Sequence, residues 1–131
     1  DVDDEGRYLL AGCSCGDACE PDGEIRIYSP GGKLDWQASL GPLGSNAAGP
    51  HDIAWSPAGY MVVALAEFSG QTLRFKVQAF APHIYEPLWT FLPAEMQGLQ
   101  VAFALAIGQY GEVYAGGLGA GSYPAVAIIP G

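Results

Sequence analysis

Short apolar runs separated by turn residues follow one another along the chain, and one such pattern recurs. In "AWSPAGYMVVAL" (54–65), an apolar segment ends at a tight turn, Ser56-Pro57-Ala58-Gly59, and a second apolar segment follows. Runs of this length bounded by Pro and Gly predict two strands joined by a turn. Two further stretches can be laid over this one, "DVDDEGRYLLAG" (1–12) and "AIGQYGEVYAGG" (106–117). The pattern therefore predicts the same strand–turn–strand unit at three places.

The spacing of single landmarks supports this repeat. The turn glycines Gly6, Gly59 and Gly111 lie 53 and 52 residues apart. Trp36 and Trp89 are also 53 residues apart, in "LDWQASLG" and "PLWTFLPA". A constant period of this length indicates stacked supersecondary units rather than one irregular fold.

Each unit contains further strand-sized runs. "EIRIY" (24–28), "TLRFKVQAF" (72–80) and "AVAII" (125–129) each follow a Gly-containing loop, and a strand that carries Trp36 or Trp89 comes next in the first two copies. Four short strands in about 50 residues, joined by hairpin turns, are typical of a propeller blade. We therefore predict an all-β fold made of β-propeller blades.

The repeat divides residues 1–131, taken as a single β-propeller segment, into about two and a half four-stranded antiparallel blades. We place a partial first blade at 1–48, a complete second blade at 49–97 and a partial third blade at 98–131. Known propellers close with at least about four blades. We therefore expect the chain to be a segment of a larger propeller. More polypeptide is the favoured source of the remaining blades, and copies of this chain are the alternative.

The composition narrows the class of partner. Half of the 131 residues are hydrophobic, and 19 Gly and 10 Pro are spread among them, which fits one domain with many turns. Fourteen acidic and five basic residues give a formal net charge of −9, which suits solubility in a secreted setting. Nucleic-acid binding needs a cationic surface, so we predict no nucleic-acid partner. No apolar run approaches the roughly 20 residues of a membrane-spanning helix, so we predict no membrane span.

Two stretches resemble NHL-type repeats. "PHDIAWSPAGYMVVA" (50–64) resembles the opening of such a repeat, and "IRIYSPGGKLDW" (25–36) resembles its later part. The matching positions are Pro50, Ile53, Ala54 and Gly59, and then Arg26, Ile27, Pro30, Gly32 and Lys33. The chain also looks like the long repeats of secreted bacterial propeller proteins. The resemblance implies a scaffold or binding module or, in a few such families, a lyase or lactonase that holds a metal on the propeller axis.

Three cysteines, Cys13, Cys15 and Cys19, fall in "CSCGDACEPDGE" (13–24), which we expect to be a loop between two strands. A disulfide that clamps this loop is the favoured interpretation, and free thiols or a metal site are the alternatives. The C-x-C-x3-C spacing differs from the C-x2-C pairs of zinc sites. Cys13 and Cys15 would lie on one strand face, where a bond is awkward, so Cys19 is the better partner for either. A disulfide would indicate an oxidising compartment.

Two acidic stretches are partly similar to calcium loops. "DVDDEG" (1–6) begins like such a loop, but Gly12 occupies the twelfth position, where a bidentate Glu is needed. "EPDG" (20–23) is a similar near match, with Ala18 where the first Asp would be. We interpret both stretches as ordinary Asp-rich turns.

The two histidines are expected in different surroundings. His51 is expected at the start of an innermost strand, near the propeller axis, where Asp52 could orient its ring. His83 is expected on the outer half of its blade, away from His51. His51 and Asp52 are therefore the ligand-binding candidates. No G-x-S-x-G elbow and no phosphate-binding glycine loop is present, so we predict no catalytic residue.

The favoured function is a non-catalytic binding or assembly scaffold, which is extracellular, periplasmic or on the cell surface. Its partner would be a protein or the remaining propeller blades. One alternative is part of a metal-dependent propeller lyase or lactonase with an axial site at His51. Another is a structural subunit piece that other chains complete through open blade edges. We predict no metal site and no cofactor, and a divalent metal stays open under the lyase alternative.

Overall fold

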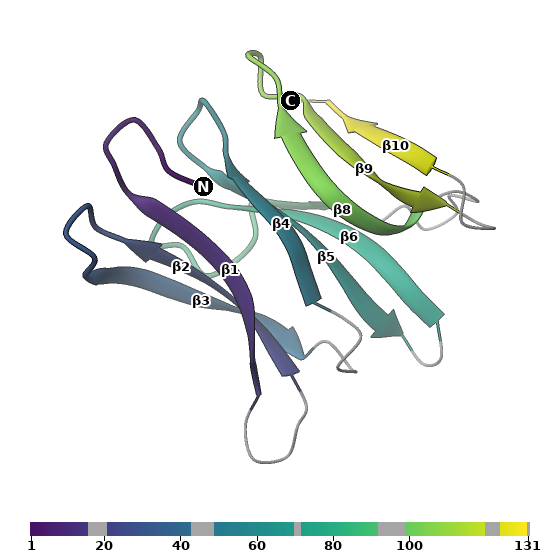
Figure 1. The fold of residues 1–131 in the computed structure, drawn as a ribbon, viewed down its shortest axis with the longest axis horizontal. Helices are drawn as coiled ribbons and strands as arrows, with labels where there is room; N and C mark the ends of the chain where they lie inside the picture. Colours follow the sequence, from purple (N-terminus) through teal and green to yellow (C-terminus); the bar gives the residue numbers. More distant parts are fainter. Residues whose placement is uncertain (16–20, 43–48, 70–71, 92–98, 120–123, 131) are drawn as a thin grey trace.

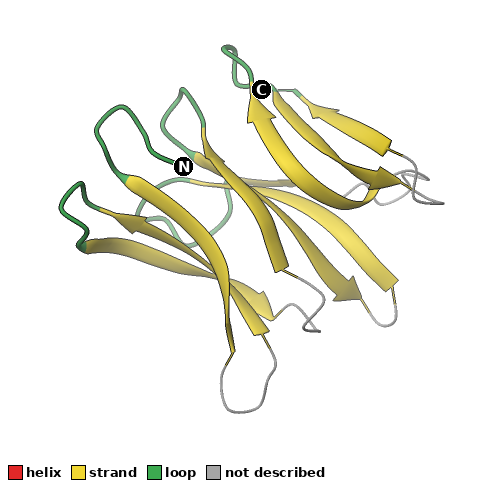
Figure 2. Cartoon of the chain, viewed as in Figure 1, coloured by secondary structure: helices red, strands yellow, loops and turns green. Residues whose placement is uncertain are grey.

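The computed structural model describes residues 1–15, 21–42, 49–69, 72–91, 99–119 and 124–130 (Figure 1). These residues form strands, turns and loops, and no helix occurs among them (Figure 2). In this part of the chain there is accordingly no helix long and apolar enough to cross a membrane. The prediction of an all-β fold is confirmed.

The strands form three antiparallel sheets, which we call the first, middle and last sheets. The first sheet contains β1 (Tyr8–Cys15), β2 (Pro21–Tyr28) and β3 (Leu34–Pro42). The middle sheet contains β4 (Gly49–Trp55), β5 (Met61–Ser69), β6 (Thr72–Phe80) and β7 (Trp89–Phe91). The last sheet contains β8 (Leu99–Ile107), β9 (Val113–Gly119) and β10 (Pro124–Ile129). In each sheet, strands that follow one another in the chain lie side by side, as in a propeller blade.

The register of the strands repeats from sheet to sheet. Three equivalent cross-strand rows lie three residues after the turn glycines: Leu9–Ile27–Trp36, Val62–Ala79–Trp89 and Tyr114–Ile128. Trp36 and Trp89 therefore occupy the same position in the first and middle sheets. The 52- to 53-residue period that the sequence predicts is a structural repeat.

The first sheet also carries the end of a fourth strand. Asp1 and Leu9 exchange backbone hydrogen bonds of 3.0 and 2.7 Å, and Val2 forms a bridge with Tyr8. These two pairs match Ala54–Val62 and Trp55–Met61 between β4 and β5 in the middle sheet. Residues 1 and 2 thus occupy the end of a strand that precedes β1 and is equivalent to β4, as the sequence pattern predicts. We call this first strand of a sheet its leading strand.

Four hairpin turns of one geometry lie at the same end of the molecule (Figure 1). They span residues 3–6, 29–32, 56–59 and 108–111. In each turn the closing glycine donates its N–H to the carbonyl three residues earlier, at 2.9 to 3.0 Å, and has φ between 77° and 86°. This left-handed conformation costs glycine little, which explains why glycine recurs at these positions.

The middle sheet is covered on both faces. All residues from Met61 to Ala66 in β5 are fully buried. Met61, Val63 and Leu65 pack in a first core against the first sheet, whereas Val62 and Ala64 pack in a second core against the last sheet. A strand covered on both faces needs apolar residues at every position, so β5 reads as a continuous hydrophobic run.

The three tryptophans pack between sheets. Trp36 is buried in the first core, Trp55 packs against that core, and Trp89 packs against the second core. The first and last sheets lie on opposite faces of the middle sheet, and the described sheets do not close into a ring (Figure 1). The assignment of 1–131 to one domain with the stated blade limits stays a prediction.

The structure corrects one expectation about the cysteine-rich segment. The composition of residues 13–24 predicts a loop, but β1 extends to Cys15 and β2 begins at Pro21. The ladder continues through Cys13–Gly23, Ser14–Asp22 and Cys15–Pro21. Backbone pairing with β1 holds these polar residues in the hairpin despite their turn-like composition, because ladder hydrogen bonds do not depend on the side chains.

Candidate functional site

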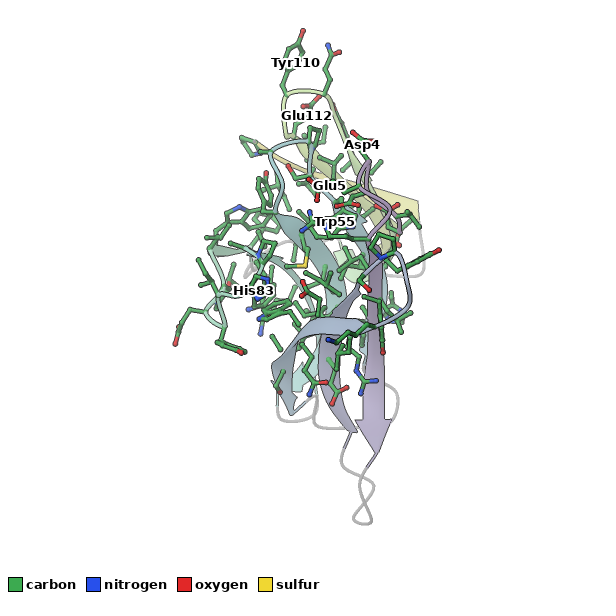
Figure 3. The ribbon with its side chains drawn as sticks, turned by 90° about the vertical axis from the view of Figure 1, so that its left-hand side faces the viewer. Asp4, Glu5, Trp55, His83, Tyr110 and Glu112 are labelled. Carbon is green, nitrogen blue, oxygen red and sulfur yellow. The ribbon has the colours of Figure 1, made fainter. Side chains whose placement is uncertain are left out.

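A cavity of about 450 Å³ opens at the turn end of the molecule, between the first and middle sheets. We call it the turn-end cleft. Its lining residues are Asp1, Val2, Asp3, Asp4, Glu5, Arg7, Trp55, Ser56, Pro57 and Gly59. The repeat creates this cleft, because it places the equivalent turns 3–6 and 56–59 at the same end of adjacent sheets. Figure 3 shows Asp4, Glu5 and Trp55 near this end and His83 apart from them.

Asp3 organises the first wall of the cleft. Its Oδ1 accepts hydrogen bonds from the backbone N–H groups of Glu5 and Arg7, at 3.1 and 2.8 Å. Its Oδ2 accepts the Arg7 Nε–H at 2.7 Å, in an ion pair that Glu5 extends at 3.5 Å. A carboxylate at the first turn position that accepts the next backbone donors is an Asx-type turn. The stretch 1–6 is thus an Asp-rich turn, as its sequence predicts.

The hydrogen-bond partners of Asp3 favour the ionised form of its carboxyl group. Desolvation raises the pKa of its carboxyl, but the hydrogen bonds from Arg7, the positive charge of Arg7 and the bond from Glu5 outweigh it and lower the pKa below its ordinary value. The folded chain therefore binds a proton at Asp3 less readily than the unfolded chain does. The stability that this carboxylate contributes is present above the ordinary aspartate pKa and is lost as the pH falls through the lowered one.

Trp55 forms the opposite wall. The Arg7 guanidinium carbon lies 4.9 Å from the Trp55 ring centroid, which is within cation–π range. The Trp55 backbone N–H donates to the Asp1 carboxylate at 2.9 Å. The indole Nε1 is buried without a hydrogen-bond partner among the residues that the structure describes. The cleft thus combines an aromatic ring, one guanidinium and four carboxylates; Asp1, Asp4 and Glu5 are exposed, and Asp3 is half-buried.

The predicted ligand-binding pair, His51 and Asp52, lies in β4 and lines a separate cavity of about 190 Å³ between β4 and β1. Asp52 Oδ1 accepts the N–H of Ile53 at 2.9 Å, and its Oδ2 accepts the N–H of Leu105 in β8 at 2.7 Å. Both carboxylate oxygens of Asp52 therefore have backbone partners. The structure assigns this side chain a part in joining two sheets, and a ligand role for the pair stays a prediction.

Asp1 makes a similar connection one sheet earlier. Its Oδ2 accepts the N–H of Trp55 in β4, as the Asp52 carboxylate accepts the N–H of Leu105 in β8. In each case a carboxylate on one leading strand binds a backbone donor on the next leading strand. A hydrogen bond to a charged acceptor is stronger than one between neutral groups, so these bonds help hold adjacent sheets together.

His83 lies at the opposite edge of the middle sheet from β4, in the connection between β6 and β7. This agrees with its expected position on the outer half of the blade. His83 has φ 64°, a left-handed conformation in a turn closed by a 3.1 Å bond from Ile84 N–H to Ala81 O. Its ring packs edge-on against Trp36 at 6.4 Å, and its Nε2 lies 3.5 Å from Asp35. These contacts hold a non-glycine residue where a turn normally favours glycine.

The described residues leave open both the cysteine prediction and the prediction of no metal site. Cys13 and Cys15 lie two residues apart in β1, and Cys19 falls outside the described residues, so the disulfide stays a prediction. Among the residues whose side chains the structure describes, no group of three or more His, Cys, Asp or Glu is placed to hold a metal. Glu20 of the EPDG segment lies outside the described residues, and Pro21–Gly23 belong to β2, where Asp22 pairs with Ser14, so the interpretation of these three residues as a turn is wrong.

The site residues that sequence reasoning missed are Arg7 and Trp55. Both lie next to a predicted turn, and the register of Gly6 with Gly59 already places these turns at equivalent positions. That register is the one sequence signal for the cleft. The Arg7–Trp55 contact itself depends on the packing of two sheets and has no local signature.

No protein-family model matches the chain, and no curated protein matches it. The resemblance to NHL-type repeats therefore stays a prediction, and the function must be argued from the geometry.

Proposed function

We propose that the chain is a non-catalytic scaffold of the propeller type that works outside the cytoplasm and binds a ligand in the turn-end cleft. The cleft is the observation that carries this proposal. It lies between two sheets whose buried cores fix the positions of the flanking turns. Binding sites are commonly built from loops held by a rigid scaffold, and concave sites lined by a few polar groups are typical ligand sites.

The charges of the cleft indicate the chemistry of its ligand. Asp3 is half-buried and binds Arg7, whereas Asp1, Asp4 and Glu5 are exposed; of these, Asp1 accepts the Trp55 N–H and Glu5 lies 3.5 Å from Arg7 Nε. The formal charge of the whole chain is also negative, at −9. A ligand with positive charges is therefore favoured both locally and by the long-range field. We propose a basic segment of a protein partner.

The test is a titration with a short peptide that contains lysine and arginine, followed by calorimetry. The Asp4→Asn, Glu5→Gln double variant should bind about threefold to tenfold more weakly, because exposed ion pairs contribute up to about 1 kcal/mol each. Added salt should weaken binding by the wild-type chain more than binding by the variant, since fewer charges remain to be screened.

The matched control changes two exposed carboxylates elsewhere, Asp35→Asn and Glu86→Gln. It removes the same charge from the molecule but leaves the cleft intact, so it should bind like the wild-type chain. Equal weakening by both double variants would show that only the net charge matters. Binding of a neutral peptide as tightly as the basic one would contradict the proposed ligand.

Assembly with other chains is a second candidate function, and the outer faces of the first and last sheets favour it. Large apolar side chains are exposed there, namely Tyr8, Leu10, Tyr114 and Ile128. Exposed apolar groups gathered on one face are typical of interaction surfaces. The scaffold would then contribute its own sheets to a larger stack.

A further inference from the structure

The two contacts between sheets in this chain use the same positions each time. We call the face of a sheet that is directed toward the preceding sheet in the chain its leading face, and the face directed toward the following sheet its trailing face. Each contact joins the trailing face of one sheet to the leading face of the next. The leading face of the middle sheet includes Met61 and Val63, which pack against the first sheet. Its trailing face includes Val62 and Ala79, which pack against the last sheet. The repeat therefore defines which face of a sheet accepts which face of its neighbour.

The leading face of the first sheet has no neighbour in the described part of the chain. Tyr8 and Leu10 flank Leu9, which points into the first core, so they lie on the opposite face of β1. Their positions after the turn glycine are those of Met61 and Val63 in the middle sheet. Tyr8 is 49% exposed and Leu10 54% exposed, whereas both middle-sheet residues are 0% exposed. Residues that are buried in the repeat are thus open here.

The trailing face of the last sheet is open in the same way. Tyr114 and Ile128 pair across β9 and β10, as Val62 and Ala79 pair across β5 and β6. Tyr114 is 37% exposed and Ile128 64% exposed, against 0% for both middle-sheet residues. Ala106 extends this row onto β8 and is also exposed. The last sheet therefore presents an apolar trailing face.

Arg26 and Glu24, on the leading face of the first sheet, are already paired with each other. Arg26 binds Glu24 Oε2 through Nη2 at 2.6 Å and through Nε at 3.1 Å, and its Nη1 lies 3.4 Å from the Tyr28 hydroxyl. The equivalent residue in the middle sheet, Gln78, is buried and donates to Thr90 Oγ1 at 3.1 Å. A paired charge can be covered by another sheet at a lower cost than an unpaired one. These polar groups are therefore compatible with a covered face.

We infer that a second copy of this chain covers these faces, with the trailing face of one last sheet packed on the leading face of the other copy's first sheet. This inference rests on the assembly role proposed above and names its partner. The two open faces lie at opposite ends of one stack, so they cannot pair within one copy. Two copies joined at both ends form a closed ring of six sheets, within the four to eight blades that propellers use.

The first measurement is the mass of the chain in solution, by light scattering after gel filtration. The inferred ring gives a mass close to twice the 13.7 kDa of one chain. Leu10→Glu on the leading face and Ile128→Lys on the trailing face should each shift the mass to that of one chain. Each places an additional charge in an apolar contact, and Arg26, which lies opposite residue 10, is already paired with Glu24, so the dimer should weaken by at least about tenfold. Tyr110→Lys is the matched control, since Tyr110 is 82% exposed at a turn and outside both faces.

A charge-swap variant separates this arrangement from other dimers. In the head-to-tail ring, Leu10→Glu and Ile128→Lys in one chain bring an introduced carboxylate and an introduced ammonium into the same contact, so the double variant should recover the dimer. In a dimer that joins two leading faces or two trailing faces, like charges would meet and the double variant would stay monomeric. Recovery supports the inference, and failure to recover overturns it.

A monomeric wild-type chain, or an open series of larger masses, would also overturn the closed pair. Binding of a hydrophobic dye then tests the broader proposal that the chain assembles with other chains. If the monomer binds the dye and Leu10→Glu reduces this binding, the faces are open for a different partner and the assembly role stands. If the monomer binds no dye, the assembly role falls with the ring. Circular dichroism of each variant checks that it is folded.

Discussion

Single glycines define the repeat at the scale of the residue. Gly6, Gly59 and Gly111 close equivalent turns, and Gly32 closes a fourth turn of the same type. Their φ values lie in the left-handed region, where a side chain costs about 1 to 2 kcal/mol. A glycine is therefore retained at each position for conformational reasons. This is why the sequence shows the period clearly at its glycines.

The first prediction concerns Gly59, whose φ is 86°. Space is not limiting, because no atom lies within 4 Å of the position that a β-carbon would occupy. Gly59→Ala should therefore lower the free energy of unfolding through backbone strain alone, by about 1 kcal/mol or slightly more. Urea unfolding, followed by tryptophan fluorescence, measures the change.

Gly12→Ala is the matched control. Gly12 lies in β1, has no left-handed φ and likewise has no atom within 4 Å of the place where a β-carbon would stand. Alanine there should leave stability unchanged or raise it by up to about 1 kcal/mol, because glycine weakens a strand interior. Equal losses for the two variants would contradict the assignment of the Gly59 effect to its φ.

Other residue-level features could not be read from the sequence. Asp1 and Asp52 accept backbone donors that lie 54 and 53 residues further along the chain. The left-handed His83 is held by Trp36 and Asp35 of a different sheet. Which backbone N–H or aromatic ring of a neighbouring sheet will contact a given residue cannot be predicted from the residues next to it in the sequence. These roles appear only once the sheets are stacked.

At the scale of the element, the sequence predicts where the strands lie but not where each strand ends. The run at 72–80 matches β6 in full, whereas β1 and β2 extend into the expected loop at 13–24. Alternating or continuous apolar runs predict buried positions, whereas the hydrogen bonds of the ladder do not depend on apolar side chains. The outer part of the β1–β2 hairpin is held by backbone pairing, which polar residues and glycine can also form.

The second prediction concerns the connection between leading strands. Asp52→Ala removes the acceptor of the 2.7 Å bond from Leu105 N–H, which joins β4 to β8. Hydrogen bonds to charged groups contribute about 1.5 to 3 kcal/mol, so the variant should lose stability of this order at most. Amide hydrogen exchange should show the largest loss of protection at Leu105, because its N–H loses its partner.

Asp35→Ala is the control for this experiment, since Asp35 is an exposed carboxylate whose partner is the exposed His83. Its loss should change stability by no more than about 0.5 kcal/mol, as is usual for exposed pairs. Unchanged exchange at Leu105 in the Asp52 variant would show that another group protects this amide. The proposed role of Asp52 in joining sheets would then be wrong.

At the scale of the whole molecule, the middle sheet determines how the stack is held together. Its β5 supplies alternate residues to two cores, with Leu65 in the first and Ala64 in the second. The sequence indicates this arrangement, because an unbroken apolar run from 61 to 66 fits a strand covered on both faces. It does not indicate what covers the outer faces, since Tyr8 and Tyr114 read equally well as buried or exposed residues.

The last prediction tests whether the sheets unfold together. Leu65 is fully buried, so Leu65→Ala should cost about 2 to 5 kcal/mol, whereas Leu88→Ala, at a half-exposed position, should cost under about 0.5 kcal/mol. Within one copy, neither outer sheet has a core without the middle one, so exchange should accelerate equally at Ile27 in the first sheet and Val113 in the last. In stacked repeats each unit is stabilised chiefly by its neighbours, and loss of the central unit leaves each outer sheet without a packed face inside its own copy. Acceleration at Ile27 alone would show instead that the last sheet keeps its structure when the first core fails.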